Sequence, residues 1–246
     1  MWSYDLIADF YATDMGQSMA FNDVEFYASL AQRHPGSALE LGCGSGRILI
    51  ELLARGVDIV GSDRSLPMLH QLRRDAAARA LAPRVTQMDL RALAFSSRFA
   101  LILAPYSLIT YLSDERELDA FMRQMRDLLR PDGALVLDAF IPRDVAPFDD
   151  FREDYSRAHG DTTLVRAKRI AKLANGCNRI ERRYRQSDAA GILMREVLTH
   201  ETIRPFTPEQ LRSLVSRHGL RCAAEHFDYG ASSVDAARFY SLIATH

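Results

Sequence analysis

Residues 38–47 read Ala-Leu-Glu-Leu-Gly-Cys-Gly-Ser-Gly-Arg, and this stretch decides the fold. The apolar run 38–41, with Glu40 inside it, predicts a short buried strand. The apolar spacing of residues 47–55 predicts a helix after it. Between the two stand three glycines at alternate positions, Gly42, Gly44 and Gly46. Glycine is needed where the backbone turns sharply and a ligand comes too close for a Cβ, so the stretch predicts a strand, a ligand-binding turn and a helix.

Strand and helix patterns alternate beyond this turn. Further apolar runs at 57–62, 84–88 and 99–104 predict strands, and the helical patterns 66–81 and 114–129 lie after the first and third of these runs. Such alternation indicates an α/β fold with a parallel sheet. After residue 129, Pro131-Asp132-Gly133 predicts a turn into a fifth strand.

An acid stands at or near the carboxyl end of each of the first three expected strands: Glu40, Asp63 and Asp89. Open parallel sheets bind ligands at those ends. Asp63 is placed to take a ribose diol with two hydrogen bonds. Its alternative role, capping the next helix, suits Ser65 better. The three acids together indicate a cofactor that contains adenosine.

The Gly-x-Gly-x-Gly spacing, with an acid two residues earlier, resembles motif I of the class I S-adenosylmethionine-dependent methyltransferases. The nicotinamide and flavin fingerprint places its third glycine one residue later. The resemblance implies a Rossmann-like seven-stranded sheet with helices on both faces and an antiparallel β insertion after the fifth strand. It also implies S-adenosylmethionine as the methyl donor, S-adenosylhomocysteine as the product, and no metal.

In that family the glycine turn packs on the methionine half of the cofactor, and the neighbouring acid holds its ammonium group. An acid in the place of Asp89 accepts from the adenine amino group. Carried over position by position, the resemblance implies these cofactor-binding residues: Tyr4, Tyr11, Glu40, Gly42, Cys43, Gly44, Gly46, Asp63, Arg64, Met68, Met88, Asp89, Leu90 and Ala104.

Residues 105–112 occupy the family's motif IV position, next to the transferred methyl group. Ala-Pro-Tyr-Ser here differs from the Asn-Pro-Pro-Tyr of enzymes that methylate nucleic-acid bases or glutamine side chains. The segment is similar to the Phe-Ser-Ser-Ile-x-His-Leu of sugar amine methyltransferases, with Tyr106 in place of the Phe and Tyr111 in place of the His. The expected catalytic residues are Tyr106, Tyr111 and Tyr11. Because Tyr111 replaces the histidine, the resemblance supplies no general base.

The sequence also predicts structure for two segments outside the core, one at the N-terminus and one after the fifth strand. Residues 3–14 predict one amphipathic helix capped by Ser3, with Tyr4 and Tyr11 on one face. In similar methyltransferases this helix lies over the cofactor; plain core packing is the alternative. Residues 142–161 predict a charged surface connection, and the period-two pattern of 162–204 predicts three antiparallel strands. The resemblance implies that these strands wall the acceptor pocket or support dimerisation.

The rest of the chain predicts a closing helix that starts at Thr207 and Pro208, followed by two last strands at 220–227 and 238–244. Asp138 and Phe140, at the end of the fifth strand, are expected to face the acceptor pocket. We therefore predict a single methyltransferase domain over 1–246. Its parts are a helical lid (1–36), a cofactor-binding core (37–141), the insertion (142–205) and the C-terminal helix and strands (206–246).

Composition narrows the possible partners. The 246 residues carry a net charge of −1 and 48% hydrophobic residues, which gives no electrostatic case for nucleic acid or a membrane surface. Three scattered cysteines form neither a disulfide framework nor a zinc pattern. With no recognisable signal peptide or spanning run, we expect a cytoplasmic monomer or homodimer.

The expected activity is methyl transfer to a small molecule, with a nitrogen of a heterocyclic or secondary metabolite as the acceptor. An O-methyltransferase is the alternative, and it would want a proton acceptor such as His200, His226 or Asp138. A nicotinamide-dependent oxidoreductase and a non-catalytic binding protein of the same fold remain as rivals. The early third glycine and Asp89 argue against the oxidoreductase, and the three strand-end acids argue against a binding protein without activity.

Overall fold

Strand β1 (Ala38–Leu41) is buried at every position and pairs in parallel with β2 (Ile59–Asp63) on one side and β4 (Phe99–Ala104) on the other. The computed structural model describes residues 2–16, 22–143, 147–233 and 236–246. They form two compact units. We call Phe21–Pro142 with Pro205–His246 the core unit, and Met1–Ala20 with Arg143–Arg204 the sheet unit.

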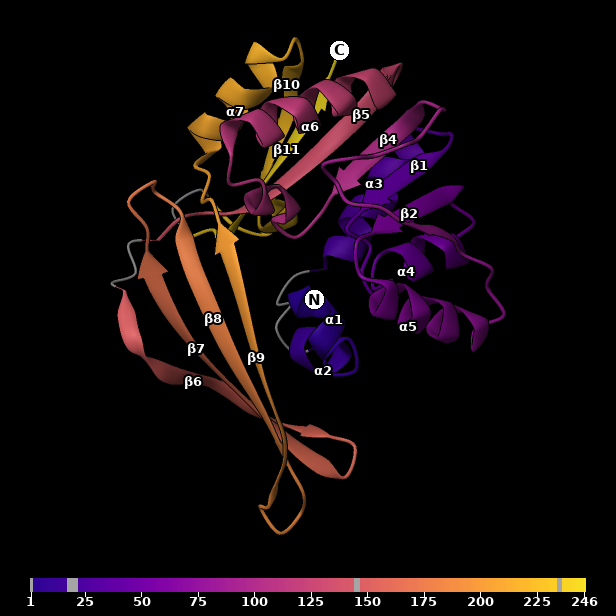
Figure 1. Cartoon of the computed structure of the whole chain (residues 1–246). Coiled ribbons are helices and arrows are strands. Elements are labelled where there is room, and N and C mark those ends of the chain that lie inside the picture. Colours follow the sequence, from indigo (N-terminus) through magenta and orange to yellow (C-terminus); the bar gives the residue numbers. More distant parts are fainter. Residues whose placement is uncertain (1, 17–21, 144–146, 234–235) are drawn as a thin grey trace. The chain divides into compact units, whose positions relative to one another are not determined.

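The core unit is built on a seven-stranded sheet with the order β10-β11-β5-β4-β1-β2-β3 (Figure 1). Strand β3 (Arg84–Gln87) continues the parallel set beyond β2. On the other side, β5 (Leu129–Phe140) pairs in parallel with β4 and antiparallel with β11 (Phe239–Thr245). Strand β10 (Arg221–Phe227) closes the edge. The predicted α/β fold with a seven-stranded methyltransferase sheet is confirmed.

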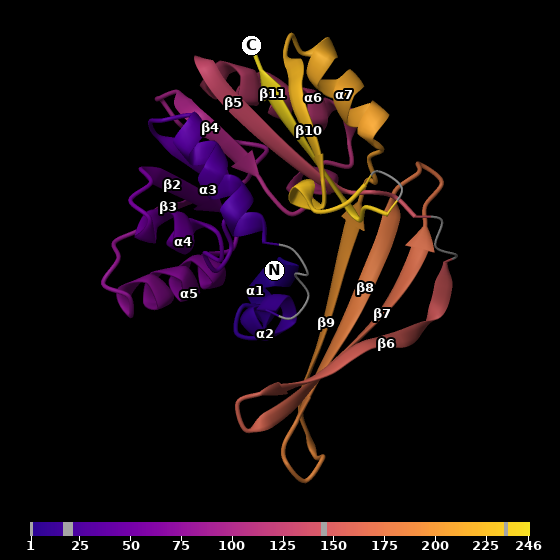
Figure 2. The same cartoon turned by 180° about the vertical axis from the view of Figure 1, so that it is seen from behind.

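Helices cover both faces of this sheet (Figures 1 and 2). On one face, α6 (Glu115–Leu128) and α7 (Pro208–Arg217) bury Phe121, Met122 and Leu211 against the sheet. On the other face lie α3 (Asp23–Arg33), α4 (Leu49–Ala54) and α5 (Leu66–Ala77). The side chains of Ser65, Asp114 and Thr207 cap α5, α6 and α7.

The expected turn at residues 131–133 lies inside β5. The helix α6 ends at Leu128, and Leu129 already pairs with Phe99 of β4. The next partners are Leu101 and Ala134, so residues 130–133 bulge out of the ladder. A Cβ on Gly133 would lie 2.9 Å from the carbonyl oxygen of Phe99, which explains the glycine at this bulge.

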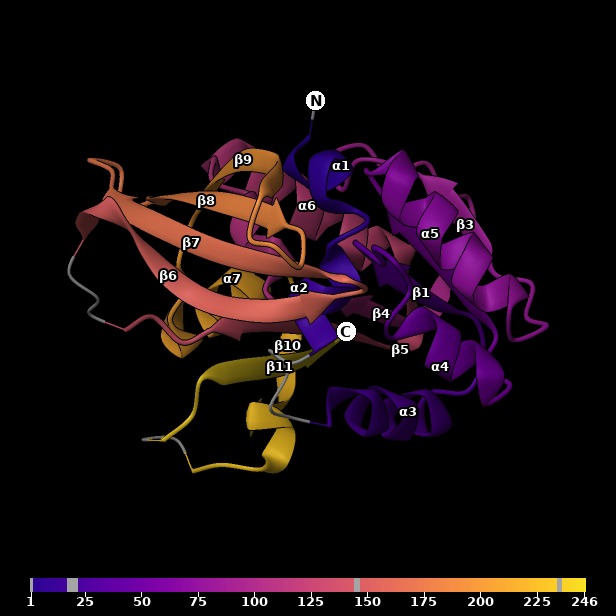
Figure 3. The ribbon, with the colours of Figure 1, turned by 90° about the horizontal axis from the view of Figure 1, so that it is seen from below.

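The sheet unit holds four antiparallel strands in sequence order, β6 (Phe148–His159), β7 (Thr162–Lys172), β8 (Asn178–Ser187) and β9 (Leu193–Ile203) (Figure 3). The expectation of a surface connection over 142–161 is wrong, because β6 occupies most of it. Charged residues hid the strand pattern: Arg152 lies 4.3 Å over the Phe148 ring and Arg157 lies 3.9 Å over the Tyr155 ring.

The N-terminal segment forms two short helices instead of one, α1 (Ser3–Ile7) and α2 (Tyr11–Gly16). Ser3 is not the cap: Trp2 occupies that position, and the Ser3 hydroxyl donates to the carbonyl of His200 on β9 at 3.1 Å. Ile7 and Phe10 pack on a buried cluster of the sheet formed by Leu164, Tyr184 and Val197. The first helices are therefore part of the sheet unit.

Within the described part of the chain, every helix is too short or too polar to cross a membrane.

Candidate functional site

The glycine turn follows β1 in a backbone that only glycine adopts easily. Gly42 has a φ of 63° and Gly46 a φ of 89°. A Cβ on Gly42 would meet Leu108 Cδ1 at 2.7 Å, and one on Gly46 would meet Leu72 Cγ at 2.6 Å. The backbone conformation and the packing of the core unit therefore favour glycine at these two positions even without a ligand. The Cys43 amide donates to the carbonyl of Ser62 at 3.0 Å, which fastens the turn to β2.

Glu40 carries a buried carboxyl group beside this turn. The residue is 2% exposed, and its Oε2 has no hydrogen-bond partner among the described residues. Burial raises the Glu40 pKa to about 8; the charge of Arg47 opposes that rise, and Asp23 and Asp63 add to it. An acidic oxygen buried without a partner is costly. The site therefore suits a cationic ligand group.

Asp23 and Arg47 form a second buried feature that the sequence did not single out. The two terminal guanidinium nitrogens of Arg47, Nη1 and Nη2, donate to the Asp23 carboxylate at 2.7 Å, and Asp23 is 2% exposed. Asp23 is the first residue of α3, and Arg47 directly follows the glycine turn. This bidentate pair links α3 to the turn. Twenty-four residues separate the two partners, so no local pattern announces the pair.

Asp63 is the last residue of β2, and its carboxylate binds backbone amides of the glycine turn and of the segment that leads into α5. Its Oδ2 accepts from the Gly44 amide at 2.8 Å, and its Oδ1 accepts from the Ser65 amide at 2.7 Å. The cap of α5 is Ser65, as expected, with its hydroxyl facing the Met68 amide. Asp63 therefore ties the glycine turn to the start of α5 at the end of β2.

Asp89 stands between two arginines. Arg64 Nε lies 3.4 Å from Asp89 Oδ2, and Arg91 Nη1 lies 3.2 Å from Asp89 Oδ1. Arg91 also donates to Glu117 at 2.8 Å and to the Tyr111 carbonyl at 3.0 Å. The predicted cofactor residues Arg64 and Asp89 thus contact each other, and Arg91 ties them to predicted catalytic Tyr111.

The remaining expected cofactor residues of the core unit lie at or after strand ends, except Met68, which lies in the first turn of α5. Cys43, Met68 and Ala104 are buried, and Met88 and Leu90 are partly exposed. The Met88 amide donates to the carbonyl of Asp63 at 3.0 Å, which brings the end of β3 to the end of β2. The structure thus gathers the glycine turn, Asp63 and the segment 88–90 at one edge of the sheet.

Tyr106 follows β4 in a strained conformation. Tyr106 and Ser107 have φ values of 52° and 62°, in the left-handed region that non-glycine residues avoid. The ring of Tyr106 packs against Phe140 and Phe239, with centroids 5.4 and 5.3 Å away. Phe140 is 44% exposed, whereas Asp138 is fully buried. Tyr106 and Phe140 thus form an aromatic surface at the ends of β4 and β5.

Tyr4 and Tyr11, expected near the cofactor, belong to the sheet unit. Their ring centroids are 5.7 Å apart in an edge-on arrangement, so the two tyrosines do share a face although the helix is broken between them. Both pack at the border of the cluster around Phe10 and Tyr184. Their approach to a cofactor stays a prediction.

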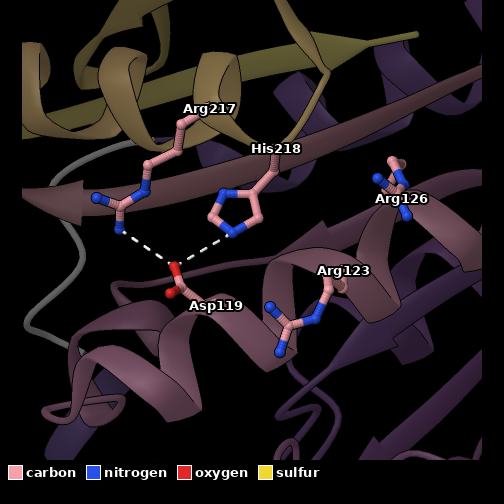
Figure 4. Close-up of a pocket in the computed structure, with 5 residues that line it drawn as sticks. All are labelled: Asp119, Arg123, Arg126, Arg217 and His218. Atoms are coloured by element: carbon pink, nitrogen blue, oxygen red, sulfur yellow. Dashed lines mark hydrogen bonds and ion pairs between the residues drawn. The ribbon is translucent and has the colours of Figure 1, made fainter.

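A separate pocket lies between α6 and α7 (Figure 4). It is lined by Asp119, Arg123, Arg126, Arg217 and His218, and none of the predicted site residues lines it. Asp119 Oδ1 lies 3.2 Å from His218 Nε2 and accepts from Arg217 at 3.4 Å. Among the residues that the structure describes, no group of three or more His, Cys, Asp or Glu side chains could hold a metal ion.

Residues 38–133 match a family model described as a methyltransferase domain. The chain is similar to the cypemycin N-terminal methyltransferase of a Streptomyces species, with 28% identity over 129 residues. That match covers 52% of this chain and 48% of the relative, so the chain spans about half the length of the curated relative it matches.

Two solved structures share the fold over nearly the whole chain. The CcbJ methyltransferase from Streptomyces caelestis has a TM-score of 0.81 and 23% identity, and the match covers 99% of this chain and 98% of that one. The sugar N-methyltransferase KedS8 from Streptoalloteichus sp ATCC 53650 has a TM-score of 0.73 and 23% identity, with 97% and 92% covered. The sheet unit is therefore part of the shared fold.

Proposed function

Because residues 38–133 match a methyltransferase domain and the whole chain shares the fold of small-molecule methyltransferases, we propose that this protein transfers a methyl group from S-adenosylmethionine to a small molecule. The observation that carries the proposal is Glu40. Its buried, unpartnered oxygen at the end of β1 offers an acceptor to the ammonium group of the cofactor's methionine part.

The residues of the core unit fit the other parts of this cofactor. Asp63 lies at the end of β2, where a ribose diol is expected, and Asp89 with Arg64 lies at the next strand end, where adenine is expected. The sulfonium of S-adenosylmethionine supplies an already activated methyl group. What the protein must add is alignment of the acceptor and exclusion of water, and alignment alone can be worth about 7–11 kcal/mol.

We expect a nitrogen acceptor, such as an amine of a sugar, peptide or heterocyclic metabolite. An amine needs little help from a base, and Oδ2 of Asp138, the carboxyl oxygen that holds the Tyr106 turn, is already engaged by three donors, although Oδ1 has no hydrogen-bond partner among the described residues. Asp138 accepts from the hydroxyl groups of Tyr27 and Tyr229 and from the Tyr106 amide. Two relatives named as an N-terminal methyltransferase and a sugar N-methyltransferase point the same way.

The O-methyltransferase alternative would need a base that the described residues do not offer plainly. Burial lowers the pKa of His226, whose ring lies 5.0 Å from Phe26 in a packed arrangement. His200 lies on β9 in the sheet unit.

Titration calorimetry with S-adenosylhomocysteine, S-adenosylmethionine and NADH tests the cofactor. We expect both adenosyl ligands to bind and NADH to give no heat. Binding of NADH without a response to S-adenosylhomocysteine would reject the proposal. Mass spectrometry of small molecules that co-purify with the protein, before and after incubation with S-adenosylmethionine, then tests the acceptor: a mass gain of one or more methyl groups identifies it.

A further inference from the structure

Asp138 sits near the end of β5 and is fully buried in the core unit. Three donors converge on its Oδ2. They are the Tyr27 hydroxyl from α3, the Tyr229 hydroxyl at 3.0 Å and the Tyr106 amide at 3.2 Å. Burial raises the Asp138 pKa, while these donors favour the ionised form. The carboxyl group therefore serves as a hub between three segments that are far apart in sequence.

The Tyr106–Ser107 turn is held from β5 at two points. Asp138 accepts the Tyr106 amide, and the Ser107 hydroxyl accepts the Phe140 amide at 2.6 Å. Both turn residues are left-handed, a conformation that costs on the order of 1–3 kcal/mol each and persists only where its surroundings enforce it. These two contacts from alternate residues of β5 enforce it here.

The two tyrosines are themselves fixed by packing. Tyr27 is wholly buried, and the Tyr229 ring lies 5.9 Å from the Tyr27 ring and 5.8 Å from the Phe239 ring. Phe239 in turn packs on the Tyr106 ring. Tyr229 therefore reaches Tyr106 by two routes: through Asp138 to the backbone and through Phe239 to the ring.

We propose that Tyr27 and Tyr229 are positioning residues for the acceptor side of the active site. Through Asp138 they hold the left-handed turn that presents the Tyr106 ring beside Phe140. This inference rests on the proposed methyl transfer, and it assigns Asp138 to the support of the turn instead of to proton removal. Cofactor binding depends on the ends of β1 to β3 and does not need the two hydroxyl groups.

The test compares three Tyr-to-Phe variants, each of which loses one hydroxyl–carboxyl bond and keeps its ring. Tyr229→Phe and Tyr27→Phe act on Asp138. Tyr240→Phe is the matched control, because the hydroxyl of this buried tyrosine donates to Glu225, away from the turn. Amide hydrogen exchange is followed by NMR on the full chain with S-adenosylhomocysteine bound. Turnover is followed with D-glucosamine and a glycyl dipeptide as probe amines.

We expect Tyr229→Phe and Tyr27→Phe to speed exchange of the Tyr106 amide about five- to tenfold, with β4 amides unchanged. The dissociation constant of S-adenosylhomocysteine should stay within about twofold, and kcat for a probe amine that is turned over should fall. Tyr240→Phe should change none of these. Unaltered exchange at Tyr106 in both variants would overturn the inference, as would a kcat equal to that of Tyr240→Phe. Failure of S-adenosylhomocysteine to bind the unmodified protein would instead count against the proposed function.

Discussion

At the scale of single residues, Glu40 makes ligand binding depend on pH. Its pKa of about 8 means that the unliganded protein holds a proton there at neutral pH, whereas a carboxylate that binds an ammonium group must release it. The affinity for S-adenosylhomocysteine should therefore rise with pH, by up to about tenfold per unit between about pH 6 and 8. Calorimetry in buffers of different ionisation enthalpy should show proton release.

Glu40→Gln is the control for this prediction. It keeps the shape and removes the titration, so its affinity should be weaker and flat with pH. The raised Glu40 pKa also makes the stability of the fold depend on pH, because the folded, unliganded chain holds a proton that the unfolded chain has lost. The free energy of unfolding of the natural protein should therefore fall, relative to Glu40→Gln, as pH rises from about 4.3 to 8. A pH-independent affinity in the natural protein would contradict the assignment.

Asp63 serves the protein and, as proposed, the ligand. Asp63→Ala removes the acceptor for the Gly44 amide as well as two expected bonds to ribose. Charge-assisted hydrogen bonds are worth about 1.5–3 kcal/mol each, so the affinity for S-adenosylhomocysteine should fall at least tenfold. Ser65→Ala is the matched control: loss of the α5 cap should cost about 1 kcal/mol of stability and leave the affinity within about twofold. An unchanged dissociation constant in Asp63→Ala would show a purely structural carboxylate.

The residue scale also shows where sequence reasoning ends. Glu40, Asp63 and Asp89 can be found because strand ends can be read from apolar runs. Their partners cannot be found in this way. Tyr27 and Tyr229 meet at Asp138 from positions about a hundred residues away on either side, and the pairing depends on how α3 and the segment after β10 pack on the sheet. The left-handed backbone of Tyr106 leaves no sign in the residue types.

At the scale of elements, α2 is fastened to the sheet unit by a buried charge. Asp14 is 4% exposed and accepts from the hydroxyl groups of Tyr155 and Tyr184 and from Arg166. Arg166 pairs with two carboxylates, Asp14 and Asp154, and Asp14→Ala leaves it with Asp154 only. This variant should lower the free energy of unfolding by about 3 kcal/mol. Faster amide exchange in α2 and β7 is the expected signature in denaturant-free solution.

Asp9→Ala provides the comparison. Asp9 pairs with Arg195 of β9 at 2.6 Å, but Asp9 is 57% exposed and Arg195 40%. Such a pair is worth about 0.2–1 kcal/mol, so this variant should be close to the natural protein. Equal losses in the two variants would mean that the buried cluster around Asp14 does not hold the helix.

The sequence reveals some strands clearly and hides others, and the difference has a physical reason. Buried parallel strands such as β4 are continuous apolar runs, and the Asn175-Gly176 and Asp188–Gly191 turns mark the hairpins between β7, β8 and β9. Strand β6 lacks a regular alternation, because its pairing with β7 shifts register twice and arginine side chains cover its aromatic rings. Its one sign in the sequence is the Gly160-Asp161 turn, which joins His159 of β6 to Thr162 of β7, with a φ of 57° at Gly160.

At the scale of the whole molecule, charge is balanced between distant segments. Residues 143–204 carry 13 Lys and Arg against ten Asp and Glu, and residues 1–20 contribute three Asp and no basic residue. The sheet unit is therefore neutral overall, although its strands are basic. Binding of the full chain to tRNA or duplex DNA should be weak and should vanish at moderate salt, because only local basic patches are available. Tight, salt-resistant binding in a filter or fluorescence assay would contradict this.

Removal of residues 1–14 separates the two readings of the N-terminal helices. The deletion takes away Ile7 and Phe10, which cover Leu164, Tyr184 and Val197, and it removes Asp14 from Arg166. The sheet unit should lose protection against amide exchange, while the strands of the core unit keep theirs, because the deleted residues belong to the sheet unit. If Tyr4 and Tyr11 contact the cofactor as predicted, affinity for S-adenosylhomocysteine and turnover should fall together.

Tyr4→Leu with Tyr11→Leu keeps apolar cover on the sheet and should reproduce the loss of affinity without the loss of protection. Full affinity in this double variant would mean that the helices serve only to cover the sheet.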